Sequence, residues 1–168
     1  TLATAVLVLE GNPMKFSARL IVVGLALLGG SVSPAGSAGD LTRQDPIETR
    51  VQLGTKDGAH RFTPDSLTFE TGKLYKLVLS NPSQSPHYFS ATEFASKVYT
   101  RKVQVVNEEG RLAEIKGDIR EIEVFPGGTT EWWFVPVSTG TFSLTCGIKD
   151  EDGRTHTEHG MVGTIVVE

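Results

Sequence analysis

The strongest constraint on the fold is a succession of short β-branched and aromatic runs, each ended by a turn rich in glycine or proline. Examples are "RVQLGT" from Arg50, "KLYKLVLSNPS" from Lys73 and "TEWWFVPVSTG" from Thr130. In "IREIEVFPGG", apolar Ile122 and Val124 alternate with glutamates before the turn. Period-two alternation with frequent turns is typical of strands that bury one face. The sequence therefore predicts an all-β sandwich or barrel.

One segment departs from this pattern. The run "ATEFASKVYTRKVQVVNEEGRLAEIKGD" covers residues 91–118 and places Phe94 and Val98 at helical i,i+4 spacing. A hairpin then turns around "NEEG". We interpret residues 91–118 as a small helix–hairpin insertion at one end of the sandwich.

The N-terminal part has the pattern of an export signal. A basic start at Met14-Lys15 is followed by the apolar run "LIVVGLALLGG" and by the small-residue site Gly36-Ser37-Ala38. These are the three regions of a signal peptide, and the apolar run is too short to span a bilayer. We expect residues 1–13 to be an over-extended reading frame, residues 14–38 a signal peptide, and residues 39–168 one periplasmic domain with no membrane span after cleavage.

The charge of the chain excludes one class of partner. The formal net charge is −4 at pH 7, and acidic and basic residues are interspersed rather than grouped. Nucleic-acid binding normally requires a basic patch or stripe. We therefore expect no nucleic-acid partner.

Cys146 is the only cysteine of the chain. In an exported protein an unpaired cysteine indicates an intermolecular bridge, a reactive thiol or a metal thiolate. A buried, inert cysteine is the remaining alternative. The surroundings favour metal binding, because two of the four histidines (His156 and His159) and one of the two methionines (Met161) follow Cys146 closely.

The other two histidines lie in different contexts. His60 lies in the polar turn "KDGAHRF", and we expect it to be exposed. His87 follows a strong strand and the turn "NPSQSP". Loops at one end of an antiparallel sandwich lie together, so His87 can approach the loop after Cys146. Two histidines, a cysteine and a methionine form the soft to borderline donor set of an electron-transfer copper site, whereas zinc gains little from methionine.

At this point the chain resembles the cupredoxins, a family of small exported type 1 copper proteins. The resemblance rests on "NPSQSPHYF" and on the C-terminal Cys…His-x4-Met pattern followed by "VGTIVV". It implies a Greek-key sandwich that holds one Cu(I)/Cu(II) ion and exchanges electrons with a redox protein. Carried over by position, the ligands are His87, Cys146, His156 and Met161. The resemblance also suggests that Asn81 ties the two ligand loops together.

The spacing between Cys146 and the next histidine departs from the family. The chain has C-x9-H, where the family usually has only a few residues. His159 therefore remains an alternative ligand to His156, although the H-x4-M spacing favours His156. The longer loop could also change the copper geometry toward a greener site.

Three alternatives to an electron carrier remain. A copper-tolerance protein that lowers free copper in the periplasm would use the same ligands. A metal-free secreted β-sandwich used for interactions would leave Cys146 inert. An enzyme is the least favoured, because a multicopper oxidase or nitrite reductase needs more histidines than the four in this chain.

Overall fold

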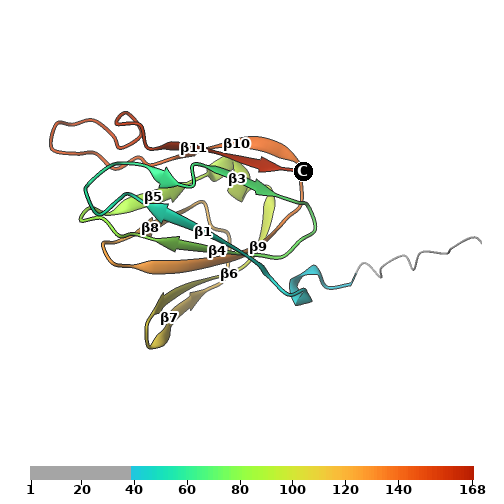
Figure 1. Ribbon diagram of the computed structural model, residues 1–168. Coiled ribbons are helices and arrows are strands. Elements are labelled where there is room, and N and C mark those ends of the chain that lie inside the picture. Colours follow the sequence, from blue (N-terminus) through green and yellow to red (C-terminus); the bar gives the residue numbers. More distant parts are fainter. Residues whose placement is uncertain (1–38) are drawn as a thin grey trace, which may run out of the picture. The chain divides into compact units, whose positions relative to one another are not determined.

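The computed structural model describes residues 39–168, and these form two β-sheets (Figure 1). The larger sheet has six strands in the order β2-β1-β4-β9-β6-β7, and the smaller has five in the order β3-β11-β10-β5-β8. The elements are η1 (Leu41–Arg43), β1 (Ile47–Leu53), β2 (Phe62–Thr63), β3 (Ser66–Phe69), β4 (Tyr75–Ser80), β5 (His87–Ser90), α1 (Thr92–Ala95), β6 (Val98–Asn107), β7 (Gly110–Ile115), β8 (Glu121–Val124), β9 (Thr129–Pro136), β10 (Gly140–Thr145) and β11 (Val162–Val167).

Both sheets are mixed rather than purely antiparallel. β1 pairs with β4 in parallel, and β11 pairs with β3 in parallel, while the other pairs are antiparallel. The parallel pairing of β1 with β4 matters for the site, because both strands then end on the same side. The loops that follow them, residues 54–61 and 81–86, are thereby brought to one end of the sandwich.

An aromatic cluster fills the space between the sheets. Phe69 comes from the smaller sheet, whereas Trp132 and Phe134 come from the larger one. Phe94 of α1 lies among them, with its ring centroid 5.3 Å from that of Phe134 and 5.8 Å from that of Trp132. All four side chains are essentially inaccessible to solvent. The alternating pattern of β9 thus places Trp132 in the core, and the neighbouring Trp133 on the opposite face contacts the cations Lys76, Arg101 and Lys102.

Residues 91–118 form the one-turn helix α1 and the β6–β7 hairpin. β6 pairs with β9 from Val98 to Val106, so the first strand of this hairpin is an integral strand of the larger sheet. β7 is the edge strand, and all its residues are exposed. In Figure 1 the hairpin extends the larger sheet beyond the area that the smaller one covers.

The loops that carry the candidate ligands gather at one end of this sandwich, on the left in Figure 1. Thr145, at the end of β10, pairs with Ser90, at the end of β5. Because these two strands are antiparallel, His87 at the start of β5 extends beyond the end of β10 and lies beside the loop 146–161.

None of the helices within residues 39–168 has the length and apolar character needed to cross a membrane. The expected signal peptide and the expected over-extended start lie outside the described residues.

Candidate metal centre

His87 is held by the turn that precedes it. Its side chain is buried, with 1% exposed, and Nε2 lies 2.9 Å from Oγ of Ser83. The Ser83 hydroxyl already has two oxygen acceptors, Oδ1 of Asn81 at 2.7 Å and the carbonyl of Ser85 at 2.9 Å. A hydroxyl has only one proton. When that proton is donated to one of the two oxygens, Ser83 accepts a hydrogen bond from Nε2–H of His87, and the lone pair of the His87 ring is then on Nδ1.

Gly54, directly after β1, makes room for the His87 ring. Its φ is +70°, in the left-handed region that favours glycine. A Cβ atom at this position would lie 2.3 Å from Nε2 of His87 and 3.0 Å from Cβ of Ser83. The turn and the histidine are therefore packed against bare backbone.

Asn81 organises the loop before His87. Its Nδ2 group donates to the carbonyl of Ser85 at 2.8 Å and to that of Val124 at 2.7 Å, and its Oδ1 accepts from the backbone N–H of Ser83. Among the described residues these bonds tie the loop to the end of β8 rather than to the loop after Cys146. The expectation that Asn81 joins the two ligand loops is therefore wrong. The register is the reason, since His87 pairs with Val124 and places β8 beside the turn.

Cys146 lies directly after β10 and is completely buried. Its Sγ atom accepts a hydrogen bond of 3.3 Å from the backbone N–H of Tyr88, the residue after His87. Its own backbone N–H donates to Oγ1 of Thr157, and that hydroxyl donates back to the Cys146 carbonyl. These bonds fix the sulfur against β5 and close the loop at its base.

His156 lies opposite His87 and beside the sulfur. Its side chain is fully buried, and its Nδ1 atom is 3.0 Å from Nδ1 of His87 and 3.4 Å from Sγ of Cys146. Nδ1 of His87, Nδ1 of His156 and the thiol thus converge on one point inside the protein.

Met161 is also fully buried, and its backbone N–H donates to the carbonyl of His156. This backbone bond links Met161 to His156.

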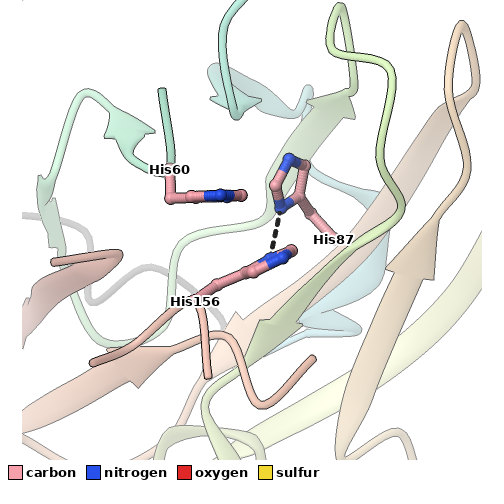
Figure 2. A group of neighbouring side chains, drawn as sticks. All are labelled: His60, His87 and His156. Carbon is pink, nitrogen blue, oxygen red and sulfur yellow. Dashed lines mark hydrogen bonds between the residues drawn. The ribbon is translucent and has the colours of Figure 1, made fainter. Parts of the chain in front are cut away.

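The sequence did not identify His60 as part of this cluster. Its ring stacks on that of His156, with centroids 4.0 Å apart and an interplanar angle of 26° (Figure 2). One nitrogen from each of His60, His87 and His156 lies within 4.8 Å of the others. The expectation that His60 is exposed is wrong, because only 21% of its side chain is accessible. The position of His60 after a strand is the signal that could have identified it. However, residues 54–61 reach the end of the sandwich that holds the other candidate ligands only because β1 pairs in parallel with β4.

His159 lies outside the convergence point. Its Nε2 atom is 3.2 Å from Oδ2 of Asp152 and 3.5 Å from Oδ2 of Asp150. The structure therefore brings His156, rather than His159, into contact with Cys146 among the described residues. The nine residues between Cys146 and His156 do not simply protrude, because a bridge between Lys149 and Thr155 folds this segment back toward His156.

The electrostatics favour neutral imidazoles. Burial, assisted by the nearby His156 and His60 rings, lowers the pKa of His87 to about 4. Burial also lowers the pKa of His156, against the opposing effect of a hydrogen bond to Asp150. Neutral imidazole is the form that ligates metals. Burial raises the pKa of the Cys146 thiol, so a metal would have to displace its proton. By their chemistry, His60, His87, His156 and Cys146 could coordinate a metal, and thiolate with imidazole fits copper.

Comparisons with known proteins bear on the fold. No protein-family model and no curated protein matches the chain. A Cu-containing nitrite reductase from Thermus scotoductus SA-01 is similar at 11% identity and a TM-score of 0.52, over 74% of this chain and 32% of that one. The McoA multicopper oxidase from Aquifex aeolicus is similar at 15% identity and a TM-score of 0.50, over 74% and 30% of the two chains. Auracyanin from Roseiflexus castenholzii is similar at 14% identity and a TM-score of 0.45, over 74% of this chain and 99% of that one.

The chain spans about a third of the oxidase and of the reductase, so their whole-protein activities are not transferred to it. At these identities the likeness concerns the fold. The two mixed sheets, the near absence of helix and the loop-borne cluster at one end agree with that likeness. The expected all-β sandwich is confirmed, and the chain has the cupredoxin fold.

Proposed function

We propose that this chain is a periplasmic, mononuclear copper protein of type 1 that carries electrons, with His87, Cys146, His156 and Met161 as ligands. The observation that carries the proposal is the convergence of two buried Nδ1 atoms and one buried sulfur. The Nδ1 atoms of His87 and His156 lie 3.0 Å apart, and Sγ of Cys146 lies 3.4 Å from Nδ1 of His156. β5 supplies His87, and the loop between β10 and β11 supplies Cys146 and His156. The fourth donor, Met161, is buried immediately before β11.

The residues of this chain would act mainly by holding the donors still. Copper, when bound, would supply a single-electron Cu(I)/Cu(II) couple. Ser83 orients His87, and the Tyr88 N–H places a positive dipole on the sulfur, which stabilises the thiolate. The burial of all three donors excludes water from the site. Donors held this firmly change little between two charge states of a bound ion, which favours fast electron exchange.

The test is a titration of the metal-free protein with Cu(II), followed by optical absorption and electron paramagnetic resonance. A strong visible sulfur-to-copper charge-transfer band at one equivalent of copper is the expected result. Its energy and the hyperfine splitting would report whether the site is blue or greener. Weak d–d absorption alone, without a charge-transfer band, would contradict the type 1 assignment.

A second function, copper tolerance by lowering free periplasmic copper, is favoured by one observation. The side chains of His156 and His87 are 0% and 1% exposed, so neither candidate imidazole ligand presents an edge at the surface of the described domain. A buried site suits retention of an ion, whereas an electron carrier must bring its donors near a partner. The electron self-exchange rate between the Cu(I) and Cu(II) forms separates the two. Fast exchange supports a carrier, and slow exchange with tight Cu(I) binding supports a tolerance protein.

The partner of an electron carrier would be another periplasmic redox protein. We place its docking area at the loop end of the sandwich, because this end lies nearest to the buried donors. An enzymatic role is not part of the proposal, since this chain matches only about a third of the oxidase and of the reductase.

A further inference from the structure

Asp150 lies at the centre of three histidines. Its Oδ1 atom is 3.1 Å from Nε2 of His156, and its Oδ2 atom is 3.0 Å from Nε2 of His60. Nε2 of His159 lies 3.5 Å from the same Oδ2. Each of the three rings therefore presents its Nε2 atom to one carboxylate.

We propose that Asp150 is a positioning residue that fixes the Nε2–H tautomer of His156 and His60, so that Nδ1 of each ring carries the lone pair available to a metal. Its role as a tuner of copper rests on the proposed function above. Its effect on the two rings does not, because it concerns the metal-free protein.

The argument for His156 follows from the acceptor chemistry of the carboxylate. An ionised carboxylate can only accept hydrogen bonds, so Nε2 of His156 must carry the proton that it donates to Oδ1 of Asp150. Nδ1 of His156 is then unprotonated and carries a lone pair. Where Ser83 accepts from Nε2–H of His87, that ring has the same tautomer, and two lone pairs then face each other across 3.0 Å. A metal cation bound by both nitrogens would satisfy both lone pairs, as would a proton held by one nitrogen and donated to the other.

The argument for His60 rests on its other nitrogen. Nδ1 of His60 is buried and has no hydrogen-bond partner. A buried donor without an acceptor is costly, and a protonated Nδ1–H would be such a donor. Donation from Nε2 to Asp150 leaves Nδ1 as an acceptor, which is the less costly state. Nδ1 of His60 is then an unprotonated nitrogen in a ring that stacks on the ring of His156.

The position of Asp150 does not depend on its side chain. Its backbone N–H donates to the carbonyl of Arg154 at 2.9 Å, and its carbonyl accepts from the N–H of Gly153 at 2.9 Å. The bridge between Lys149 and Thr155 closes the same turn. A substitution at Asp150 should therefore change what the rings meet while the loop keeps its shape.

The first experiment needs no substitution. Long-range ¹H–¹⁵N correlation spectra of the metal-free protein at neutral pH report which ring nitrogen carries the proton. For His156 and His60 we expect protonated Nε2 and unprotonated Nδ1. A proton on Nδ1 of either ring would overturn the proposal.

The second experiment compares Asp150→Asn with Asp152→Asn. Asp152 is 47% exposed and contacts His159 rather than His156, so its substitution is a matched control in the same loop. Asp150→Asn should give mixed tautomers for His156 and His60, and Asp150→Glu should restore part of the original signature. With Cu(II) as the probe, Asp150→Asn should weaken binding about tenfold to a hundredfold, as is typical for the carboxylate partner of a ligating histidine. Equal spectra and equal affinities for the Asp150→Asn and Asp152→Asn variants would contradict the proposal.

The failure of this inference can be told apart from the failure of the proposed function. If the unsubstituted protein shows the expected tautomers but binds no Cu(II), the copper assignment is wrong and the positioning role of Asp150 stands. If it binds Cu(II) with a charge-transfer band but the tautomers do not depend on Asp150, the positioning role is wrong. The ring signals and the metal titration are thus independent readouts.

Discussion

The Nδ1 atoms of His87 and His156 lie 3.0 Å apart, although the two residues are 69 positions apart in the chain. The contact joins β5 to the loop that leads into β11, at the same end of the sandwich. Because Sγ of Cys146 lies 3.4 Å from the same Nδ1 atom of His156, the three side chains form one donor set. The following predictions test how each part of this set contributes.

Cys146→Ser tests the thiolate. We expect the variant to lose the visible charge-transfer band completely, because a hydroxyl oxygen cannot provide a sulfur-to-copper transition. The side chains are similar in size and shape, so the far-ultraviolet circular dichroism of the β domain should be unchanged. A variant that keeps the band would exclude Cys146 as the source of the colour.

Met161→Leu tests the proposed thioether ligand. The variant should still bind Cu(II), since a long axial thioether contributes little affinity. Its reduction potential should rise, because an apolar neighbour stabilises Cu(II) less than a thioether does. The swap conserves volume in a fully buried position, so the free energy of unfolding should fall by less than about 1.5 kcal/mol. Protein-film voltammetry measures the potential, and complete loss of copper would show a larger role for Met161.

The pair His156→Ala and His159→Ala tests which histidine binds the metal. His156 touches both His87 and Cys146, whereas His159 contacts Asp150 and Asp152 at the rim. We expect His156→Ala to abolish or grossly alter the Cu(II) spectrum and His159→Ala to leave it nearly unchanged. The opposite pattern would move the ligand assignment to His159.

Gly54→Ala tests the packing around His87. The added Cβ would lie 2.3 Å from Nε2 of His87, so the ring must move and the bond to Ser83 is lost. We expect weaker Cu(II) binding and a loss of about 1–3 kcal/mol in the free energy of unfolding from overpacking, beyond the backbone strain.

Gly58→Ala is the matched control for that change. Gly58 lies in the same loop and has a φ of +86°, but its Cβ would meet nothing within 4 Å. It should therefore show only the backbone strain, about 1–2 kcal/mol, with unchanged Cu(II) affinity. Equal copper affinities in the two variants would argue against a role for Gly54 in placing His87.

The sequence predicted the β-sandwich from short β-branched and aromatic runs ended by turns, and the alternation in β8 reports directly which face is buried. Ile122 and Val124 are both in the core, as their positions indicate. The gathering of Cys146, His156 and Met161 was visible because all three lie in one short stretch. Their individual roles as ligands, and that of His87, stay predictions.

Other parts of the site could not be read from the sequence, because they depend on pairing between distant strands. His60 joins the cluster only because β1 runs parallel to β4, and local alternation does not reveal the direction of pairing. Asp150 lies in a charged run that has the composition of a solvated surface loop. Its contact with His156 arises because the segment after Cys146 folds back, which depends on the bridge between Lys149 and Thr155.

In the periplasmic location proposed above, which is oxidising, the single cysteine has a consequence for the stability of the domain. A small exported protein commonly gains stability from disulfides, and this chain cannot form one within itself. The donor set joins residues as far apart as His87 and His156, so an ion held by it would act as a reversible cross-link. Unfolding would then require release of the ion, and the melting temperature should rise with the free metal concentration. The resistance of the domain to heat and proteases would thus be set by its surroundings as well as by its sequence.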